Sequence, residues 1–440
     1  MTRSVRPTYP DAIRDHAMRS HRESSARSIL LAAGLAVLAA NVDEARAQVP
    51  ACVAPKVDWQ GSRAVFRSSR VESGPDPFRS ATVSERVILS VGRRTGLDAD
   101  SSDALVELRP SASGPLSRSA TITPPQGSAM FRFPVVAGLP NDGLVAVWGE
   151  RADSVQGPLS TDSTAIVRVV AADYRGGAWS KPTVLARASG IGWNSISISN
   201  AVATRRGTIH VAVPAFRHLQ SEYLLLLSHS ESGWRTQEIP KRAGAVYATL
   251  AVRNDSLLLA FAAPVVDSIP DVNSIWFVSS ADDGRTWGTP RLLRRSGLVP
   301  AYDVKILSSS SGPITVVWRQ HDPAGLGEYF WAMRSHDGGR TWTAPTKWQP
   351  PNGVTRVFSA IASAGGAADL LFASHGGDRL NILRACADGS WRHAPASPDS
   401  FKPANGAAFI EESDGSRGLV WSVLVPIWPP FRQWIHTAVR

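Results

Sequence analysis

The sequence predicts an all-β protein built from repeated antiparallel sheets, and three observations support this. An eight-residue pattern, S-x-D-x-G-x-T-W, occurs twice, beginning at Ser280 and at Ser335. Tryptophans that end this pattern or weaker copies of it recur at intervals of 55, 53, 55 and 49 residues: Trp179, Trp234, Trp287, Trp342 and Trp391. Alternating or β-branched runs precede each of them. Because a four-stranded propeller blade takes roughly 40–50 residues, the period predicts a β-propeller.

The eight-residue pattern is suited to a tight turn. Its aspartate, Asp282 or Asp337, can accept hydrogen bonds from the amides of its own turn, and its glycine can adopt a positive φ. The tryptophan can then fold back as an apolar plug between sheets. This pattern resembles the Asp-box of the sialidase-like β-propellers, and we expect it to determine architecture more than chemistry.

Each complete repeat is expected to begin with an inner strand. These strands are expected near 133–138, 196–203, 248–252, 304–307 and 358–362. A sixth repeat begins near Ala407 and lacks a tryptophan-marked turn and a fourth strand. Strand-like runs between Val83 and Ile122 can supply the missing strand and close the ring, which removes exposed sheet edges. We therefore predict a six-bladed propeller of four-stranded blades, closed by one or more N-terminal strands, with seven blades as the alternative.

The N-terminus has the features of a secretory signal peptide. An apolar run, Ile29–Ala40, follows three arginines, and Ala45-Arg46-Ala47 supplies small residues before a cleavage site; Met18 is an alternative start. We expect export to the periplasm or the extracellular space, and no membrane span in the mature chain. The predicted parts are a signal peptide (1–47), an N-terminal segment that contributes closing strands (48–125) and the Asp-box propeller (126–440).

Composition and charge narrow the possible partners. The net charge is +10, and a basic exported protein could favour acidic ligands such as sialylated or uronic-acid glycans. The arginines are scattered, so we expect no nucleic-acid partner. The ten histidines show no close metal-ligand spacing, so we expect no metal site, and no motif indicates a cofactor. We expect a monomer. Cys52 and Cys386 form one disulfide, as suits an oxidising compartment, or remain two unpaired thiols.

The resemblance implies a ligand site on the rim opposite the Asp-box turns. Phe131-Arg132-Phe133-Pro134 resembles the sialidase motif whose arginine binds the substrate carboxylate. Arg319 and Arg356 stand where the family has two further arginines, so the three could hold a carboxylate through charge-assisted hydrogen bonds. The alternative is that they are unrelated charges of the rim loops. Trp428, in an aromatic and proline-rich loop, could stack against a sugar, bind a partner or plug the ring closure.

The family also implies three catalytic groups. Asp153 and Asp162, on the long loop 149–164, are candidates for the acid/base aspartate. Asp303 stands where the family has the glutamate that activates a tyrosine nucleophile. If the enzyme acts on another glycan, we expect Asp303 to face Asp153 or Asp162 across the pocket as a carboxylate pair.

The nucleophile itself is missing from its expected place. No tyrosine follows Tyr329, so the last repeat has none. Tyr302 and Tyr247 open the fourth and third repeats and are the remaining candidates that could point into the channel. Without the tyrosine–glutamate pair, covalent catalysis loses its first step. We therefore expect exo-sialidase activity to be weak or absent.

These observations leave two classes of function open. One is an exported, sialidase-like glycoside hydrolase that acts on an acidic glycan through the arginine triad. The other is a non-catalytic propeller that binds a glycan or a protein partner at the envelope or outside the cell. The three arginines favour the first, and the missing tyrosine favours the second.

Overall fold

A computed structural model describes residues 52–439, apart from short stretches of which 152–165 is the longest. These residues belong to the unit Cys52–Arg440. The predicted signal peptide lies outside the described residues. Within the described part, the strands form seven antiparallel sheets, and one short 3-10 helix, η2 (Ala364–Gly366), lies between two strands.

The sheets are blades that we number in chain order. Blade one contains β2 (Glu72–Val83), β3 (Arg86–Arg93), β4 (Asp103–Pro110) and β5 (Leu116–Ile122). Blade two contains β6 (Arg132–Gly138), β7 (Leu144–Arg151), β8 (Ile166–Arg175), β9 (Ala178–Trp179) and β10 (Thr183–Ser189). Blade three contains β11 (Ala201–Ala203), β12 (Ile209–Arg217), β13 (Ser221–Ser230) and β14 (Gly233–Glu238). Blade four contains β15 (Val246–Arg253), β16 (Ser256–Pro264), β17 (Asn273–Ser280) and β18 (Arg291–Arg294).

The remaining three blades complete the chain. Blade five contains β19 (Ala301–Ser308), β20 (Ile314–His321), β21 (Glu328–Ser335) and β22 (Thr346–Trp348). Blade six contains β23 (Val354–Ala362), β24 (Ala368–Ser374), β25 (Leu380–Ala385) and β26 (Trp391–Pro395). Blade seven contains β27 (Pro403–Glu411), β28 (Arg417–Val425), β29 (Phe431–Val439) and, as its outer strand, β1 (Arg63–Ser69).

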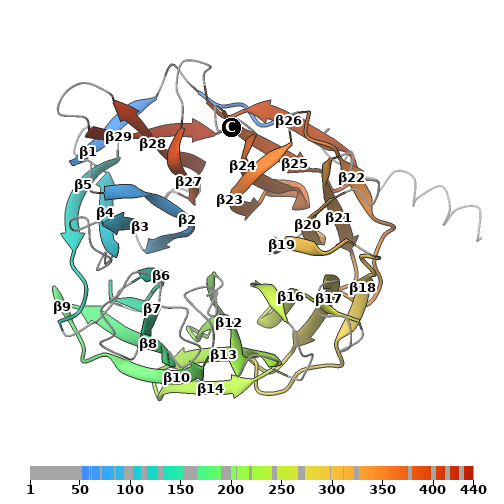
Figure 1. The fold of residues 1–440 in the computed structure, drawn as a ribbon, viewed down its shortest axis with the longest axis horizontal. Helices are drawn as coiled ribbons and strands as arrows, with labels where there is room; N and C mark the ends of the chain where they lie inside the picture. Colours follow the sequence, from blue (N-terminus) through green and yellow to red (C-terminus); the bar gives the residue numbers. More distant parts are fainter. Residues whose placement is uncertain are drawn as a thin grey trace, which may run out of the picture. The chain divides into compact units, whose positions relative to one another are not determined.

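The inner strands of the seven blades follow one another around a ring (Figure 1). Each contacts the inner strand of the next blade, from β2 through β6, β11, β15, β19 and β23 to β27, and β27 contacts β2. The outer strand of blade seven, β1, precedes every other described strand and pairs with β29. Blade seven therefore combines strands from both ends of the repeat array, and backbone hydrogen bonds close the ring.

The prediction of six blades is wrong. Residues 72–122 supply a complete blade rather than a closing strand, and the strand that completes the last blade is β1. The connection from Pro110 to Leu116, between the third and fourth strands of blade one, contains no tryptophan. A count based on tryptophan spacing could not register this blade, although its strands bury apolar residues as the others do.

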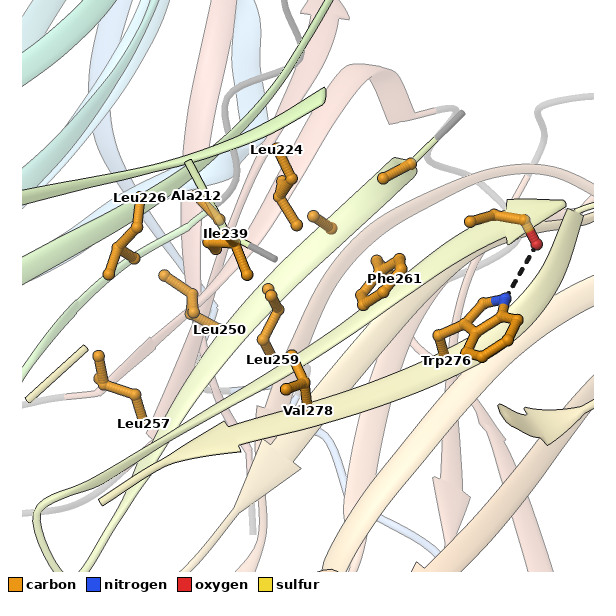
Figure 2. Packing of buried hydrophobic residues seen from close by; sticks show 13 residues of the cluster. Ala212, Leu224, Leu226, Ile239, Leu250, Leu257, Leu259, Phe261, Trp276 and Val278 are labelled. Carbon is orange, nitrogen blue, oxygen red and sulfur yellow. Dashed lines mark hydrogen bonds between the residues drawn. The ribbon is translucent and has the colours of Figure 1, made fainter. Parts of the chain in front are cut away.

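Neighbouring blades are held together by buried apolar side chains. Figure 2 shows the cluster between blades three and four, in which Leu226 of β13 packs near Leu250, Leu257 and Leu259 of blade four. Trp276 lies in the same cluster, and its Nε1 donates a hydrogen bond to the carbonyl oxygen of Ala263 at 3.1 Å. Full burial of one large apolar side chain contributes about 1.5–3 kcal/mol, so these inter-blade clusters are the main source of stability.

The two Asp-box turns make the same four hydrogen bonds. In the first, Asp282 Oδ1 accepts from Ser280 Oγ and from Thr286 N, both at 2.8 Å, and its Oδ2 accepts from Thr286 Oγ1 at 2.6 Å. The backbone N of Gly284 donates to Ser280 Oγ at 2.9 Å. The turn that begins at Ser335 repeats these bonds at 2.8, 2.8, 2.6 and 2.7 Å. The turn is therefore held by its own side chains, as the pattern predicts.

Blade six closes its outer turn with a different device. Cys386, directly after β25, forms a disulfide with Cys52, and their Cα atoms are 6.0 Å apart. The carbonyl oxygen of Cys52 accepts a hydrogen bond from Arg392 Nε at 3.0 Å, and that of Val53 accepts one from Arg384 Nη1 at 3.1 Å. Of the two alternatives for the cysteines, the structure has the disulfide, and it fastens the segment before β1 to blade six.

Candidate functional site

The candidate site lies on blade five, at the end opposite its Asp-box turn. Glu328 is the first residue of β21, whereas Ser335, where the box turn begins, is the last. Tyr302 and Asp303 lie near the start of β19, and Arg319 lies near the end of β20. Because neighbouring strands are antiparallel, these four functional side chains belong to the same end of the sheet.

Arg319 lies at the centre of this group. Its Nη2 is 2.8 Å from Oδ2 of Asp303, and its Nη1 is 3.3 Å from Oε2 of Glu328 and 3.1 Å from the carbonyl oxygen of Val354 on blade six. Its guanidinium carbon lies 4.5 Å from the centre of the Tyr302 ring. Both terminal nitrogens are thus engaged inside the protein, and two carboxylates offset the positive charge.

Glu328 links a phenol to an imidazole. The Tyr302 hydroxyl donates to Oε1 of Glu328 at 2.6 Å, and the same oxygen lies 3.3 Å from Nε2 of His321. The Glu328 side chain is 11% exposed and that of His321 is 56% exposed, so the imidazole faces solvent. Burial, reinforced by the hydrogen bond to Glu328, raises the pKa of Tyr302 above its usual range. The phenol is therefore protonated at neutral pH, with Glu328 placed to receive its proton.

A β-bulge positions Asp303. The pairing of β19 with β20 shifts between Tyr302 and Lys305, and Asp303 is the first bulged residue. It has a φ of 52°, which is uncommon outside glycine although aspartate tolerates it better than most residues. The bulge carries the carboxylate that lies closest to the Arg319 guanidinium.

The structure brings three of the predicted site residues together. Tyr302, Asp303 and Arg319 form one group with Glu328 and His321, which we call the Tyr302 cluster. A tyrosine–glutamate pair therefore exists, but within blade five rather than on the last blade. Arg319 does not present two free Nη atoms for a carboxylate, because both already contact acceptors of the protein.

The other predicted residues are not brought into this cluster by any described contact. Arg132 is the first residue of β6 on blade two, and Arg356 lies in β23 on blade six; the positions of their side chains are outside the described part. Asp153, Asp162 and Trp428 lie outside the described residues, so the predicted carboxylate pair across the pocket stays a prediction.

Sequence reasoning missed Glu328 and His321. A signal for both exists in the alternation of strands, because Arg319 and His321 are two residues apart and so share one face of β20. Finding Glu328 requires the pairing of His321 with Glu328 across β20 and β21. That pairing depends on the length of the connection between the two strands, which no motif marks.

Metal and membrane features were also sought in the described part. None of its groups of histidine, cysteine, aspartate and glutamate side chains could hold a metal ion. Among the same residues, no helix has the length and apolar character needed to cross a membrane.

The family model of the BNR repeat-like domain matches residues 144–392, which span blades two to six. The chain belongs to this family. Its Asp-box turns and blades identify this BNR repeat protein as a member of the sialidase-like propeller superfamily. No curated protein matches it in sequence.

Solved structures share the fold of this BNR repeat protein. An ulvan lyase, described as a new polysaccharide lyase family, is 11% identical with a TM-score of 0.53, over 81% of this chain and 93% of that one. The Trypanosoma rangeli sialidase is 12% identical with a TM-score of 0.47, over 87% and 57%. The NanB sialidase of Streptococcus pneumoniae is 13% identical with a TM-score of 0.43, over 86% and 69%. At these identities the likeness shows the fold alone.

Proposed function

We propose that this protein is a glycan-active enzyme that cleaves a glycosidic bond at the Tyr302 cluster. The observation that carries the proposal is the 2.6 Å hydrogen bond from Tyr302 Oη to Glu328 Oε1, at the rim opposite the Asp-box turns. A phenol held by a carboxylate is a combination that can serve acid–base or nucleophilic chemistry. Membership of the sialidase-like superfamily supports a sugar substrate.

In a hydrolytic reaction, Tyr302 is the nucleophile. Its oxygen attacks the anomeric carbon while its proton passes to Glu328, and the glycosidic oxygen leaves as an alcohol once an acid protonates it. Because the pKa of Tyr302 is raised, attack and proton transfer must occur together. Arg319 and Asp303 position Glu328 and the ring, and water then releases the sugar from the tyrosine ether.

An acidic glycan remains the proposed substrate, with the carboxylate bound by arginines other than Arg319. The net charge of +10 supports an acidic ligand, and Arg356 lies on β23, the inner strand next to β19. Arg132 is the remaining candidate. Arg319 is then a positioning residue, because its charge is offset by Asp303 and Glu328.

Elimination is a second candidate reaction, and His321 favours it. A base removes the proton next to the carboxylate of a uronate, the bond from the ring to the glycosidic oxygen breaks, and an acid protonates that oxygen, leaving a carbon–carbon double bond. His321 is exposed and shares Glu328 Oε1 with Tyr302, so the two could act as base and acid on one sugar.

Assay of the purified protein on sialyllactose and polygalacturonate tests the proposal. Hydrolysis releases new reducing ends without ultraviolet absorbance, whereas elimination produces both. Tyr302→Phe should lower kcat about 100-fold or more. Tyr329→Phe is the matched control, because the Tyr329 ring contacts Trp331 and Lys347 outside the cluster. Turnover that survives Tyr302→Phe contradicts the assignment, and binding without turnover favours the non-catalytic alternative.

Action outside the cytoplasm is part of the same proposal. The apolar run Ile29–Ala40 and the disulfide between Cys52 and Cys386 support export to an oxidising compartment. Mass spectrometry of the protein recovered from periplasmic and culture fractions tests this, and a mature N-terminus near Gln48 is expected.

A further inference from the structure

Tyr247 repeats, on blade four, the backbone device that positions Asp303 on blade five. The pairing of β15 with β16 shifts between Val246 and Thr249, as the pairing of β19 with β20 shifts at Asp303. Tyr247 and Asp303 are the first bulged residues of their strands, with φ values of 51° and 52°. The same bulge thus carries an aromatic side chain on one blade and a carboxylate on the next.

The two bulges lie on neighbouring inner strands. The backbone N of Ile306 on β19 donates to Oγ1 of Thr249 on β15 at 2.9 Å. Tyr247 is two residues before Thr249, and Asp303 is three residues before Ile306, toward the strand ends away from the Asp-box turns. Tyr247 therefore lies at the rim that carries the Tyr302 cluster.

The exposure and the backbone of Tyr247 are both unusual. It is 43% exposed, and the other large apolar side chains found exposed in the described part are Val53 and Val184. A positive φ strains a bulky residue, whereas asparagine or glycine adopts it readily. Packing in the core does not explain why this strain is kept, since much of the ring is in solvent. Strained residues of this kind cluster at ligand sites.

We propose that the Tyr247 ring is a stacking platform for a second sugar unit of the glycan whose first unit occupies the Tyr302 cluster. The flat apolar face of a phenol ring suits the C–H face of a pyranose, and its hydroxyl can bind a sugar oxygen. The inference rests on the proposed function and adds that the substrate is an oligosaccharide bound across blades four and five.

Binding measured by calorimetry in a Tyr302→Phe background tests the platform. The probes are sialyllactose, digalacturonate and tetragalacturonate. Tyr247→Asn should weaken the best-bound of these probes about tenfold, the effect of losing one aromatic contact. Tyr247→Phe should bind as the unaltered ring does, because it keeps the stacking face. Thermal unfolding should show that Tyr247→Asn is at least as stable, because asparagine suits the positive φ better.

Two results overturn the platform, and they are distinguishable. Equal affinity of Tyr247→Asn and Tyr247→Phe for a probe that binds overturns the platform alone and leaves the proposed function standing. Failure of every probe to bind, with no turnover by the unaltered protein, overturns both. If Tyr247→Asn does not fold, Tyr247→Gly provides the same test, because glycine also removes the ring and accepts the backbone conformation.

Discussion

The two rims of blades four and five use repetition in opposite ways. At the Asp-box rim the same residue types make the same four hydrogen bonds in both blades, and matching distances differ by at most 0.2 Å. At the other rim the backbone bulge is repeated, but its first residue is Tyr247 in one blade and Asp303 in the next. Repeated side chains maintain the fold, whereas a repeated backbone with varied side chains offers positions for function.

The largest effect is expected at the functional rim, for Arg319→Met. Loss of the guanidinium leaves the Asp303 and Glu328 carboxylates together without their cation, and removing one partner of a buried pair costs about 3–5 kcal/mol. Urea denaturation measures this loss, and glycan turnover should fall with it. Arg294→Met is the control: Arg294 is exposed and lies over the Trp331 ring at 5.4 Å, so about 1 kcal/mol or less is expected. Similar losses in both variants would contradict the central place of Arg319.

The next effect concerns the turn of blade six, where a disulfide stands in place of a complete Asp-box. Replacing Cys52 and Cys386 together by serine should lower the free energy of unfolding by about 2–4 kcal/mol. Thermal unfolding with and without reductant provides the measurement. Reductant should lower the Tm of the unaltered protein and leave that of the double variant unchanged. An unaltered protein whose Tm ignores reductant would argue against a stabilising disulfide.

A smaller effect is expected for one glycine of the Asp-box rim. A Cβ at Gly339 would lie 2.5 Å from Cε1 of Phe277 on blade four, and the φ of Gly339 is 93°. Gly339→Ala should cost about 2–4 kcal/mol, from the left-handed backbone together with overpacking.

Gly338→Ala is the matched control for this turn. Gly338 has a φ of 76° and nothing within 4 Å of its Cβ position, so only the backbone cost of about 1–2 kcal/mol is expected. The difference between the two midpoints of urea denaturation isolates the contact between the turn and blade four. Equal losses would show that the turn does not dock on Phe277.

The smallest effect is the response to acid. Burial lowers the pKa of His210, whose Nε2 lies 3.0 Å from Oδ1 of Asp283 in the first Asp-box turn. The unfolded chain therefore protonates first, so this stability is present above the ordinary pKa of 6.5 and is lost as the pH falls toward the folded pKa. Hydrogen bonds from Thr286 lower the pKa of Asp282 to about 2, so its contribution persists until the pH falls below 3.8 and toward 2.

Urea denaturation at about pH 7 and about pH 5 measures the histidine effect. The unaltered protein should lose stability between the two, and His210→Asn should lose less, because part of the proton uptake on unfolding is gone. An identical decline in both proteins would assign the acid response to other groups, among them His229 and His393, whose pKa values burial also lowers.

The parts of the fold that were predictable are those that short segments build. The Asp-box contacts join residues that are at most four positions apart, such as Ser280 and Gly284, so the eight-residue pattern contains the whole turn. The superfamily and the β-propeller architecture followed from that turn and its period. The number of blades did not, because blade one has no such turn and only the pairing of its strands reveals it.

The site divides along the same line. Sequence by itself determined that a propeller with Asp-box turns forms and that Tyr302, Asp303 and Arg319 lie near the start or end of strands, since these depend on local pattern. Only the tertiary structure decided that Arg319 is occupied by two carboxylates and that Glu328 joins Tyr302 to His321. The physical reason is that these contacts cross three strands, and the register between strands depends on connections whose length and conformation no local pattern encodes.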